Sequence, residues 1–224
     1  MTRPPGTPTS SVTATTTDAA VLHLTLRDLA CSRGERLLFK HLNLQLWRGE
    51  AVWLRGPNGQ GKTSLLRLVA GLSRPVAGQV DVHAARVYIG HQPAIKDDLS
   101  VLEALGFLAR LHDLPAHDTA LVQALDAWGL KAKRHALVRT LSQGQRRRVA
   151  LARLALSPAA ALWVLDEPFD ALDAAGVDAL LALVQTHRQS GGSLLFTSHQ
   201  AVDLPACRTL DLPSGASTPS EAAT

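Results

Sequence analysis

The stretch Ala51–Gly71 carries glycine, lysine and threonine at a spacing that could bind phosphate. The pattern G-x-x-x-x-G-K-[ST], typical of a phosphate-binding loop, is met by Gly56, Gly61, Lys62 and Thr63. The apolar run before the loop predicts a strand, and the apolar periodicity after it predicts a helix that starts near Lys62. This strand–loop–helix context predicts a binding site for a nucleoside triphosphate.

The residue types in the loop explain how a phosphate would be held. Glycine lacks a Cβ atom, so the backbone can curl and point its N–H groups at phosphate oxygens. The helix start adds the positive end of its dipole, Lys62 can reach the β- and γ-phosphates, and the Thr63 hydroxyl can bind Mg²⁺. We expect nucleotide contacts along the whole loop, from Gly56, Pro57, Asn58, Gly59, Gln60, Gly61, Lys62, Thr63 and Ser64.

Hydrolysis would need acidic groups beside the phosphates, and two follow a fully apolar run. Leu162–Leu165 predicts a strand buried on both faces, and it leads directly into Asp166 and Glu167. Ligands bind at the carboxyl ends of the strands in open α/β sheets, so both carboxylates are expected at that edge. We assign Asp166 to Mg²⁺ and Glu167 to polarising the attacking water. The alternative is an acidic turn without a chemical role.

Two further polar residues are expected at the same edge. His199 follows the apolar strand predicted for Ser193–Thr197, and it can donate to the γ-phosphate and orient the water. Gln92 follows the strand candidate Val87–Ile89, and it could bind the metal and sense the γ-phosphate. On its own, such a histidine could also be an incidental polar residue.

A second candidate phosphate site lies in Leu141–Gln145, just before an arginine-rich helix. A serine hydroxyl, a glycine N–H and a helix N-terminus form an anion site, here from Ser142, Gly144 and Gln145. One chain cannot easily fold this site onto the first. We therefore expect it to serve a nucleotide that another copy of the chain holds.

Composition limits the remaining possibilities. The 224 residues are 46% apolar, which suits one globular domain, alone or with an inserted lobe. No apolar run is long enough to span a membrane, and the N-terminal residues lack the apolar segment of a secretory signal. Cys31 and Cys207 have no metal-ligand spacing and suit a reducing cytosol.

The net charge of +4 includes one notable basic cluster, Arg146, Arg147 and Arg148. Nucleic-acid binding is one interpretation of this cluster. We favour another, in which the arginines form a solvated helix face or attract anionic lipid beside a membrane partner. No nucleic-acid partner is therefore expected.

The ends and the first half of the chain predict tails and short strands. Residues 1–20 and 213–224 are rich in Ser, Thr, Pro and Ala, and we expect both to be disordered tails. Strand patterns from Val21 and over Leu42–Leu46 predict a small antiparallel sheet. Gly78–Ile89 predicts a short hairpin.

The second half predicts helices around a parallel sheet. Periodicity over Asp97–Thr140 predicts an inserted helical lobe, which would extend to about residue 145. Gln145–Ser157 and Val177–Arg188 predict two more helices. Strands and helices alternate on both sides of the lobe, which favours an α/β fold with a parallel sheet.

Together these motifs resemble those of the ATP-binding subunits of ATP-binding-cassette (ABC) transporters, over residues 21–212. In that family GPNGQGKT, residues 56–63, is the Walker A motif, and LWVLDE, residues 162–167, is Walker B. LSQGQ at residues 141–145 stands for the family signature LSGGQ, Gln92 for the Q-loop, Asp173 for the end of the D-loop, and His199 for the switch histidine. All six motifs occur in the family's order.

The resemblance implies an α/β, P-loop NTPase fold of the ABC type, with an antiparallel β subdomain and an inserted helical subdomain. It implies ATP and Mg²⁺ as cofactors, with Thr63, Gln92 and Asp166 at the metal and Glu167 and His199 as catalytic residues. It also implies a head-to-tail homodimer with two ATP molecules between the copies, in which Ser142, Gly144, Gln145 and Asp173 join the nucleotide contacts. Residues that follow Gln92 would relay motion to a separate integral-membrane partner.

A narrower resemblance is to the heme-exporter subunits that serve cytochrome c maturation. It is carried by GHQPAIK at residues 90–96, by LSQGQRRRVALARL at 141–154, by LWVLDEPFDALD at 162–173 and by TSHQ at 197–200. It implies a peripheral ATPase at the cytoplasmic face of the bacterial inner membrane. ATP hydrolysis would drive release of a heme-loaded periplasmic chaperone, so the chain would contact heme only indirectly.

Two departures from the ABC pattern leave questions open. Gln143 replaces the usual glycine of the signature, at a position that tolerates substitution. The aromatic residue that usually stacks on adenine is missing before Gly34, so Arg33 or Arg36 would have to stack instead, and the preference for ATP over GTP rests on the family.

Rival interpretations are the ATPase of another exporter, a soluble ABC ATPase linked to DNA or ribosomes, and a nucleotide-binding module without catalysis.

Overall fold

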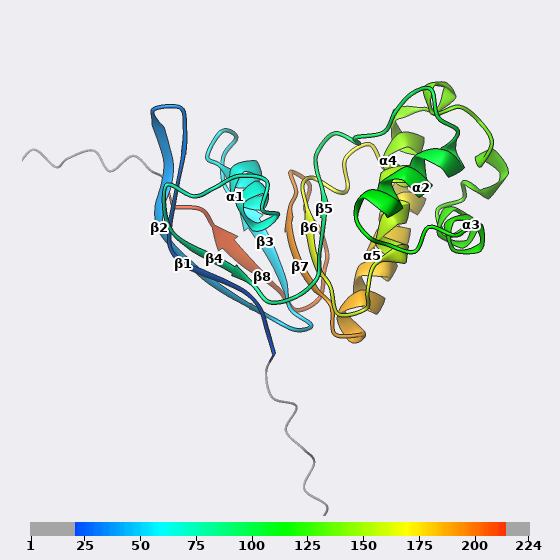
Figure 1. Ribbon diagram of the computed structural model, residues 1–224. Helices are drawn as coiled ribbons and strands as arrows, with labels where there is room; N and C mark the ends of the chain where they lie inside the picture. The colour runs from blue at the N-terminus through cyan, green and yellow to red at the C-terminus, as the bar shows by residue number, and fades with distance from the viewer. Residues whose placement is uncertain (1–20, 214–224) are drawn as a thin grey trace, which may run out of the picture.

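The computed structural model describes residues 21–213, so the two predicted tails lie outside the described residues except for Pro213. Its centre is a parallel sheet of five strands in the order β5-β6-β7-β3-β8 (Figure 1). These strands are β3 (Ala51–Arg55), β5 (Arg86–Ile89), β6 (Leu162–Leu165), β7 (Ser193–Thr197) and β8 (Cys207–Asp211). The α/β fold expected from the sequence is confirmed.

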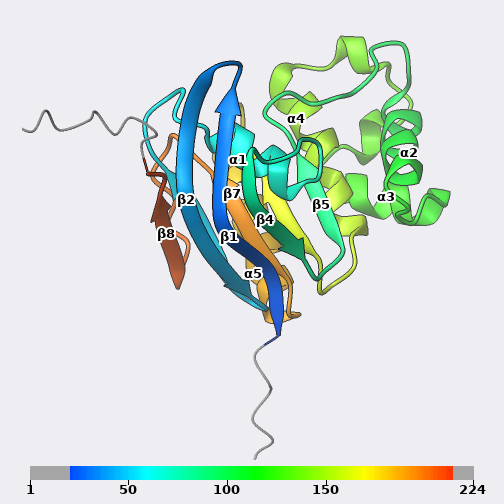
Figure 2. The same cartoon turned by 60° about the vertical axis from the view of Figure 1, so that its left-hand side comes forward.

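A second, antiparallel sheet of three strands covers one side of the molecule (Figure 2). Its order is β2-β1-β4, from β1 (Leu22–Arg33), β2 (Arg36–Trp47) and β4 (Ala77–Val82). The buried leucines of β1 and β2 face inward, towards α1 (Lys62–Val69). Helix α1 therefore lies between the two sheets (Figure 1).

Alternation along the parallel strands separates two hydrophobic cores. In β6, Leu162 and Val164 pack with α1 and the antiparallel sheet, while Trp163 and Leu165 pack with the helices of the other face. Successive side chains of a strand point to opposite faces, and both faces are covered here. This explains why β6 is apolar throughout and buried at every position.

Helices cover the second face of the sheet and form a lobe beside it (Figure 1). Helix α5 (Ala174–Gln189) packs on the sheet, and α4 (Gln143–Ala152) continues into the short helix η3 (Arg153–Leu156). The lobe holds α2 (Val101–Leu111), α3 (Asp118–Asp126), η1 (Lys131–Lys133) and η2 (Val138–Thr140). None of the helices within residues 21–213 has the length and apolar character needed to cross a membrane.

Two predictions about elements need correction, and one strand was missed. The hairpin over Gly78–Ile89 is wrong, because β4 pairs with β1 in the antiparallel sheet whereas β5 pairs with β6 in the parallel sheet. The helix expected from Gln145 starts at Gln143, because Ser142 caps it. Strand β8, which pairs with β3, was not expected, because all five of its side chains are exposed or only half-buried.

Candidate nucleotide-binding and hydrolysis site

The phosphate loop and the ends of β6 and β7 border one recess of about 300 Å³. Nine residues predicted from the sequence line it, namely Asn58, Gly59, Gly61, Lys62, Thr63, Ser64, Asp166, Glu167 and His199. Segments more than a hundred residues apart in the chain thus meet at the carboxyl edge of the parallel sheet, where ligands bind in such folds. Arg33, Leu38 and His91 complete the lining.

The loop conformation depends on Gly61, which precedes α1. Its φ of 109° is one that side chains with a Cβ rarely adopt, and an added Cβ would lie 3.1 Å from Cβ of Leu38. Leu38, which sequence reasoning did not identify, therefore packs directly against the loop. Lys62 Nζ donates to the carbonyl oxygens of Gly56 at 2.6 Å and Pro57 at 3.2 Å, which holds the ammonium group over the loop.

The two carboxylates after β6 are both buried, Asp166 at 2% exposure and Glu167 at 5%. The Thr197 hydroxyl joins them, since it accepts from the Glu167 N–H and donates to Asp166 Oδ1, both at 2.9 Å. Glu167 has a φ of 50°, a strained value for a residue with a side chain. Such strain persists where surrounding contacts fix the backbone, and it often marks functional positions.

The residues at this edge fit a magnesium ion. Asp166 Oδ2 is buried and has no hydrogen-bond partner among residues 21–213, which leaves a buried acceptor beside the phosphate loop. Mg²⁺ prefers carboxylate and hydroxyl oxygens together with phosphate oxygens, and Thr63 lines the same recess. Asp166 and Thr63 are therefore suited to hold it.

His199 contacts the Glu167 carboxylate twice. Its backbone N–H donates to Oε2 at 2.8 Å, and its Nε2 lies 3.4 Å from Oε1. The imidazole is half exposed while the carboxylate is buried. This geometry fixes the direction of the carboxylate and leaves the histidine ring accessible from the recess.

Apart from the signature residues, five residues predicted for the nucleotide or metal do not line this recess. Gly56 and Pro57, at the start of the loop, accept hydrogen bonds from Lys62 through their carbonyl oxygens. Gln92 is exposed on a loop and lines a neighbouring groove. Gln60 instead donates through Nε2 to the Leu212 carbonyl oxygen at 2.6 Å, which ties the loop to the chain after β8. Asp173 pairs with Arg148 and caps α5 by accepting from Gly176 N, and these contacts, that of Arg148 first, lower the pKa of its carboxyl group.

The signature residues Ser142, Gly144 and Gln145 also lie outside the recess, at the N-terminus of α4. Ser142 Oγ accepts from Gln145 N, and Gln145 Oε1 accepts from Ser142 N, which forms a capping box. The Ser142 hydroxyl hydrogen is not used in this motif and remains available to donate. The proposed role of these residues towards another copy's nucleotide thus stays a prediction.

The basic cluster on α4 is not a solvated face, which corrects the interpretation favoured from the sequence. Arg147 is only 2% exposed, Arg146 pairs with Asp97, and Arg148 pairs with Asp173. Helical periodicity could have separated Arg147 from its neighbours. It could not have shown that an arginine side chain would be buried.

Comparison with known proteins agrees with the geometry. Residues 39–170 match the family model described as "ABC transporter". The chain belongs to the ABC transporter family. It is 46% identical to the "Cytochrome c biogenesis ATP-binding export protein CcmA" of Pseudomonas syringae pv. syringae over 82% of this chain and 92% of the relative. The protein of the same name in Methylococcus capsulatus is 44% identical over 82% of this chain and 95% of the relative.

Solved structures show the same fold. An ABC transporter ATP-binding protein from Pyrococcus furiosus superposes with a TM-score of 0.73 at 23% identity, over 84% of this chain and 96% of that one. The ATP-binding cassette MJ0796, solved as a dimer with ADP and phosphate, superposes with a TM-score of 0.69 at 23% identity, over 79% and 88%. As a member of this family with its phosphate loop, Asp166, Glu167 and His199 at one recess, the chain is an ATPase.

Proposed function

We propose that this chain is the ATP-hydrolysing subunit of a membrane ABC complex that serves cytochrome c maturation. The observation that carries the proposal is the likeness to proteins named for cytochrome c biogenesis, at 46% identity over 92% of the length of the first. Lys62, Asp166, Glu167 and His199 line one recess, which supports an active rather than an inactive cassette.

Hydrolysis at this recess would use the chain's own groups as follows. Backbone N–H groups of the loop and Lys62 bind the β- and γ-phosphates and offset the charge of the transferring group. The Glu167 carboxylate orients a water molecule and accepts its proton as the water oxygen attacks the γ-phosphorus, and the bond to the ADP oxygen breaks. ADP and phosphate are the products. Mg²⁺, held by Asp166 and Thr63, would supply positive charge next to the phosphates.

The active form would be a homodimer in which each copy completes the other's site. The N-terminus of α4 lies outside the recess of its own chain but presents Ser142 and Gly144, whose groups suit an anion. Two copies in head-to-tail arrangement would each place this end on the nucleotide of the other. Gln92, and Asp173 with its neighbours, would lie near that interface.

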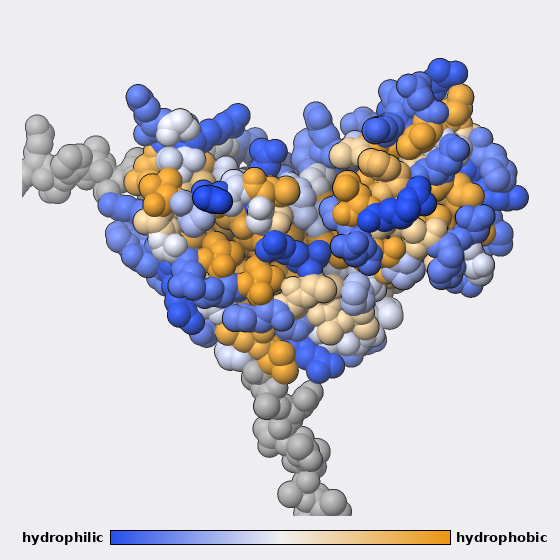
Figure 3. All heavy atoms as spheres, in the orientation of Figure 1, coloured by the Kyte–Doolittle hydropathy of each residue, from blue (hydrophilic) through white to orange (hydrophobic). Residues whose placement is uncertain are grey.

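A separate membrane-embedded partner would bind beside the recess. A groove of about 730 Å³ separates the strand-rich part of the molecule from the helical lobe, and Gln92 lines it together with Thr63 and Asp166. Three of its lining residues are large, apolar and exposed, namely Leu72 at 62%, Phe107 at 38% and Leu111 at 63%. Figure 3 shows apolar surface on both sides of the groove between these two parts. A peripheral position at the cytoplasmic face of the inner membrane follows from this proposal, and the heme chaperone would be reached only through the membrane partner.

The test uses the full chain with Glu167→Gln, which removes the proton acceptor but keeps the shape of the side chain. With ATP and Mg²⁺ the variant should bind nucleotide without turnover and elute at twice the monomer mass. When it is isolated from solubilised membranes, small multi-span subunits and a heme-binding periplasmic chaperone should accompany it. Cells that carry only this variant should lack c-type cytochromes.

Three outcomes would contradict parts of the proposal. Capture of an unrelated permease with normal c-type cytochromes would leave an ABC ATPase but remove the role in cytochrome c maturation. Recovery of nucleic acid without a membrane partner would overturn both. Unchanged turnover in the variant would show that Glu167 does not accept the proton.

A further inference from the structure

The Arg147 side chain reaches from α4 into the backbone beneath the recess. Its guanidinium donates to five carbonyl oxygens, those of Gly90, His91, Asp166, Glu167 and Pro168, at 2.7, 3.1, 2.9, 2.6 and 3.4 Å. An arginine side chain has five N–H groups, so each of them is used. Arg147 forms no ion pair with a carboxylate of the described residues.

These five carbonyl groups belong to two separate strand ends. Gly90 and His91 follow β5 and precede Gln92, while the other three residues form the turn that carries both carboxylates after β6. One planar group thus holds the Gln92 segment, the turn of Glu167 and helix α4 in a fixed relation. A guanidinium is suited to this because its N–H groups have fixed directions.

The strained backbone of Glu167 needs such support. A non-glycine residue at positive φ is strained and persists only where its surroundings fix it. The Glu167 carbonyl accepts from Arg147 at 2.6 Å, and the Glu167 N–H donates to Thr197 at 2.9 Å. Arg147 also bonds the carbonyl groups on both sides, of Asp166 and Pro168.

We infer that Arg147 is a positioning residue for ATP hydrolysis, which fixes the Glu167 carboxylate in its reactive direction without contacting the nucleotide. Arg147 does not line the recess, so its loss should spare nucleotide binding. The inference rests on hydrolysis at this recess and is independent of the role in cytochrome c maturation. An approach of the water or carboxylate that is wrong by about 1 Å can lower a rate roughly a hundredfold.

The test compares four full-length variants with the wild type by steady-state ATPase kinetics, equilibrium binding of a fluorescent ATP analogue and thermal unfolding. Arg147→Lys keeps the charge but can form at most three of the five bonds. Arg147→Ala leaves a cavity that ethylguanidinium could fill, and Arg147→Met fills that space with apolar atoms. Arg146→Gln is the matched control, because the neighbouring Arg146 pairs with Asp97 at the surface.

We expect Arg147→Lys to lower kcat by roughly tenfold to a hundredfold with nucleotide affinity changed less than about twofold. Ethylguanidinium should restore part of kcat in Arg147→Ala and have no effect on Arg147→Met. Arg146→Gln should behave like the wild type. If Arg147→Ala does not fold, Arg147→Lys decides the question.

A wild-type kcat in Arg147→Lys would overturn the inference, as would a loss of nucleotide affinity in proportion to the loss of rate. Absence of rescue in a folded Arg147→Ala would also contradict it. A wild-type chain that hydrolyses ATP but does not support cytochrome c maturation would remove the proposed function and leave this inference intact.

Discussion

Thr197 links the two carboxylates of the site through a single hydroxyl group. It is fully buried at the end of β7, where its Oγ1 accepts from Glu167 N and donates to Asp166 Oδ1. A hydroxyl group can do both at once, whereas an apolar side chain of the same shape leaves two buried polar groups without partners. Thr197 therefore belongs to the site, although the sequence analysis cited it only as the first residue of the TSHQ stretch and gave it no role.

We predict that Thr197→Val lowers the free energy of unfolding by about 1–3 kcal/mol. It should lower kcat by roughly tenfold or more, because the Glu167 N–H loses its hydrogen-bond acceptor. The effect on ATP binding should be smaller. Urea unfolding and steady-state kinetics measure both quantities. Thr197→Ser keeps the hydroxyl and is the control; equal kcat values for the serine and valine variants would contradict the prediction.

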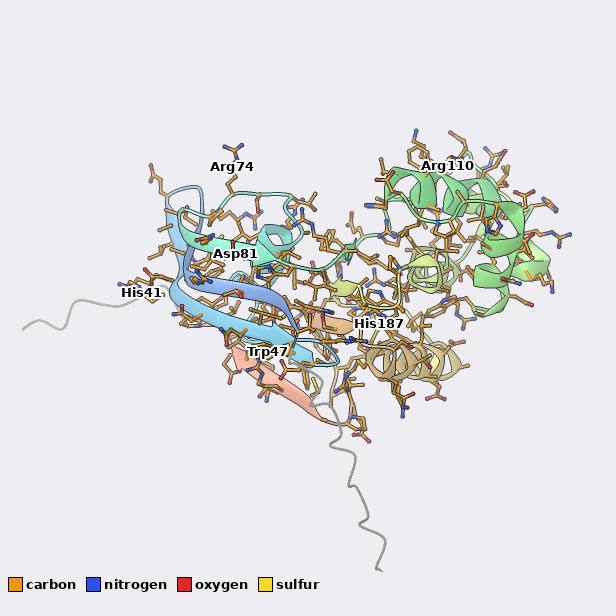
Figure 4. The ribbon with its side chains drawn as sticks, turned by 60° about the horizontal axis from the view of Figure 1, so that its bottom comes forward. His41, Trp47, Arg74, Asp81, Arg110 and His187 are labelled. Carbon is orange, nitrogen blue, oxygen red and sulfur yellow. The ribbon has the colours of Figure 1, made fainter. Side chains whose placement is uncertain are left out.

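His187 is a titratable group of the core rather than of the site. Its ring stacks on Trp163 with centroids 3.6 Å apart, and Nε2 donates to the Ala161 carbonyl at 2.9 Å, where α5 meets the parallel sheet (Figure 4). Burial lowers the pKa of His187 to about 4 from an ordinary value of 6.5. The pKa of His23 is also lowered, first by burial and then by the charge of Arg48.

The folded state therefore favours neutral His187, and the unfolded chain binds the extra proton first. The contribution of neutral His187 to the free energy of unfolding is fully present above the ordinary pKa of 6.5. This contribution should be lost as the pH falls towards 4. The loss from His187 is at most on the order of 3 kcal/mol. His187→Phe keeps an aromatic ring but cannot titrate. The free energy of unfolding of this variant, measured with urea between pH 6.5 and 4, should therefore fall less steeply than that of the wild type. The fall that remains in the variant is due partly to His23. Parallel declines for the two proteins would contradict the assignment.

The N-terminus of α4 is packed against the segment before α5. A Cβ added at Gly144 would lie 2.6 Å from the Ala171 carbonyl oxygen, closer than real contacts allow. Arg148 pairs with Asp173 in the same region. The end of the helix that would face another copy's nucleotide is thus fixed to the segment that follows the catalytic turn.

We predict that Gly144→Ala destabilises the protein, although alanine favours helices. Overpacking costs about 1–3 kcal/mol, whereas the gain in helix propensity is at most about 1 kcal/mol. A net loss of about 1–2 kcal/mol and a lower ATPase rate should follow, measured by thermal unfolding and kinetics. Gln143→Ala, at the exposed neighbouring position, should change stability by less than about 0.5 kcal/mol. Equal stability of the two variants would show that the contact with Ala171 relaxes without cost.

At the scale of the whole molecule, the groove between the strand-rich part and the lobe is the place where an external partner would act. Apolar residues come to it from both sides, Leu72 after α1 and Leu111 at the end of α2. Exposed apolar side chains around a recess are typical of interaction sites. The groove also borders Gln92, which connects it to the nucleotide recess.

We predict that Leu111→Asp weakens retention of the membrane partner by about tenfold, because a carboxylate would be placed in an apolar contact. Folding and basal ATPase activity should be unchanged, since Leu111 is 63% exposed. Val76→Asp is the matched control, because Val76 is 64% exposed and does not line the groove. Membrane co-purification of tagged chains measures retention, and equal loss in both variants would contradict the assignment.

The sequence by itself determined the parts of this protein that depend on local physics. A glycine-rich loop between a strand and a helix binds phosphate through its own backbone, so Gly56 to Ser64 could be recognised without a fold. An apolar run of strand length followed by Asp166 and Glu167 likewise predicts a buried parallel strand and its acidic end.

Only the tertiary structure decided which distant segments meet. The sequence pattern of Gly78–Ile89 is the same for a hairpin and for two strands in different sheets, because side-chain alternation does not determine which strand pairs with which. The sequence alone predicts that Arg147 is a surface charge. In the structure it donates hydrogen bonds to carbonyl groups that lie 19 to 57 residues away along the chain. Thr197 and Leu38 gain their roles in the same way, since a site built at the edge of a sheet depends on contacts that no local pattern encodes.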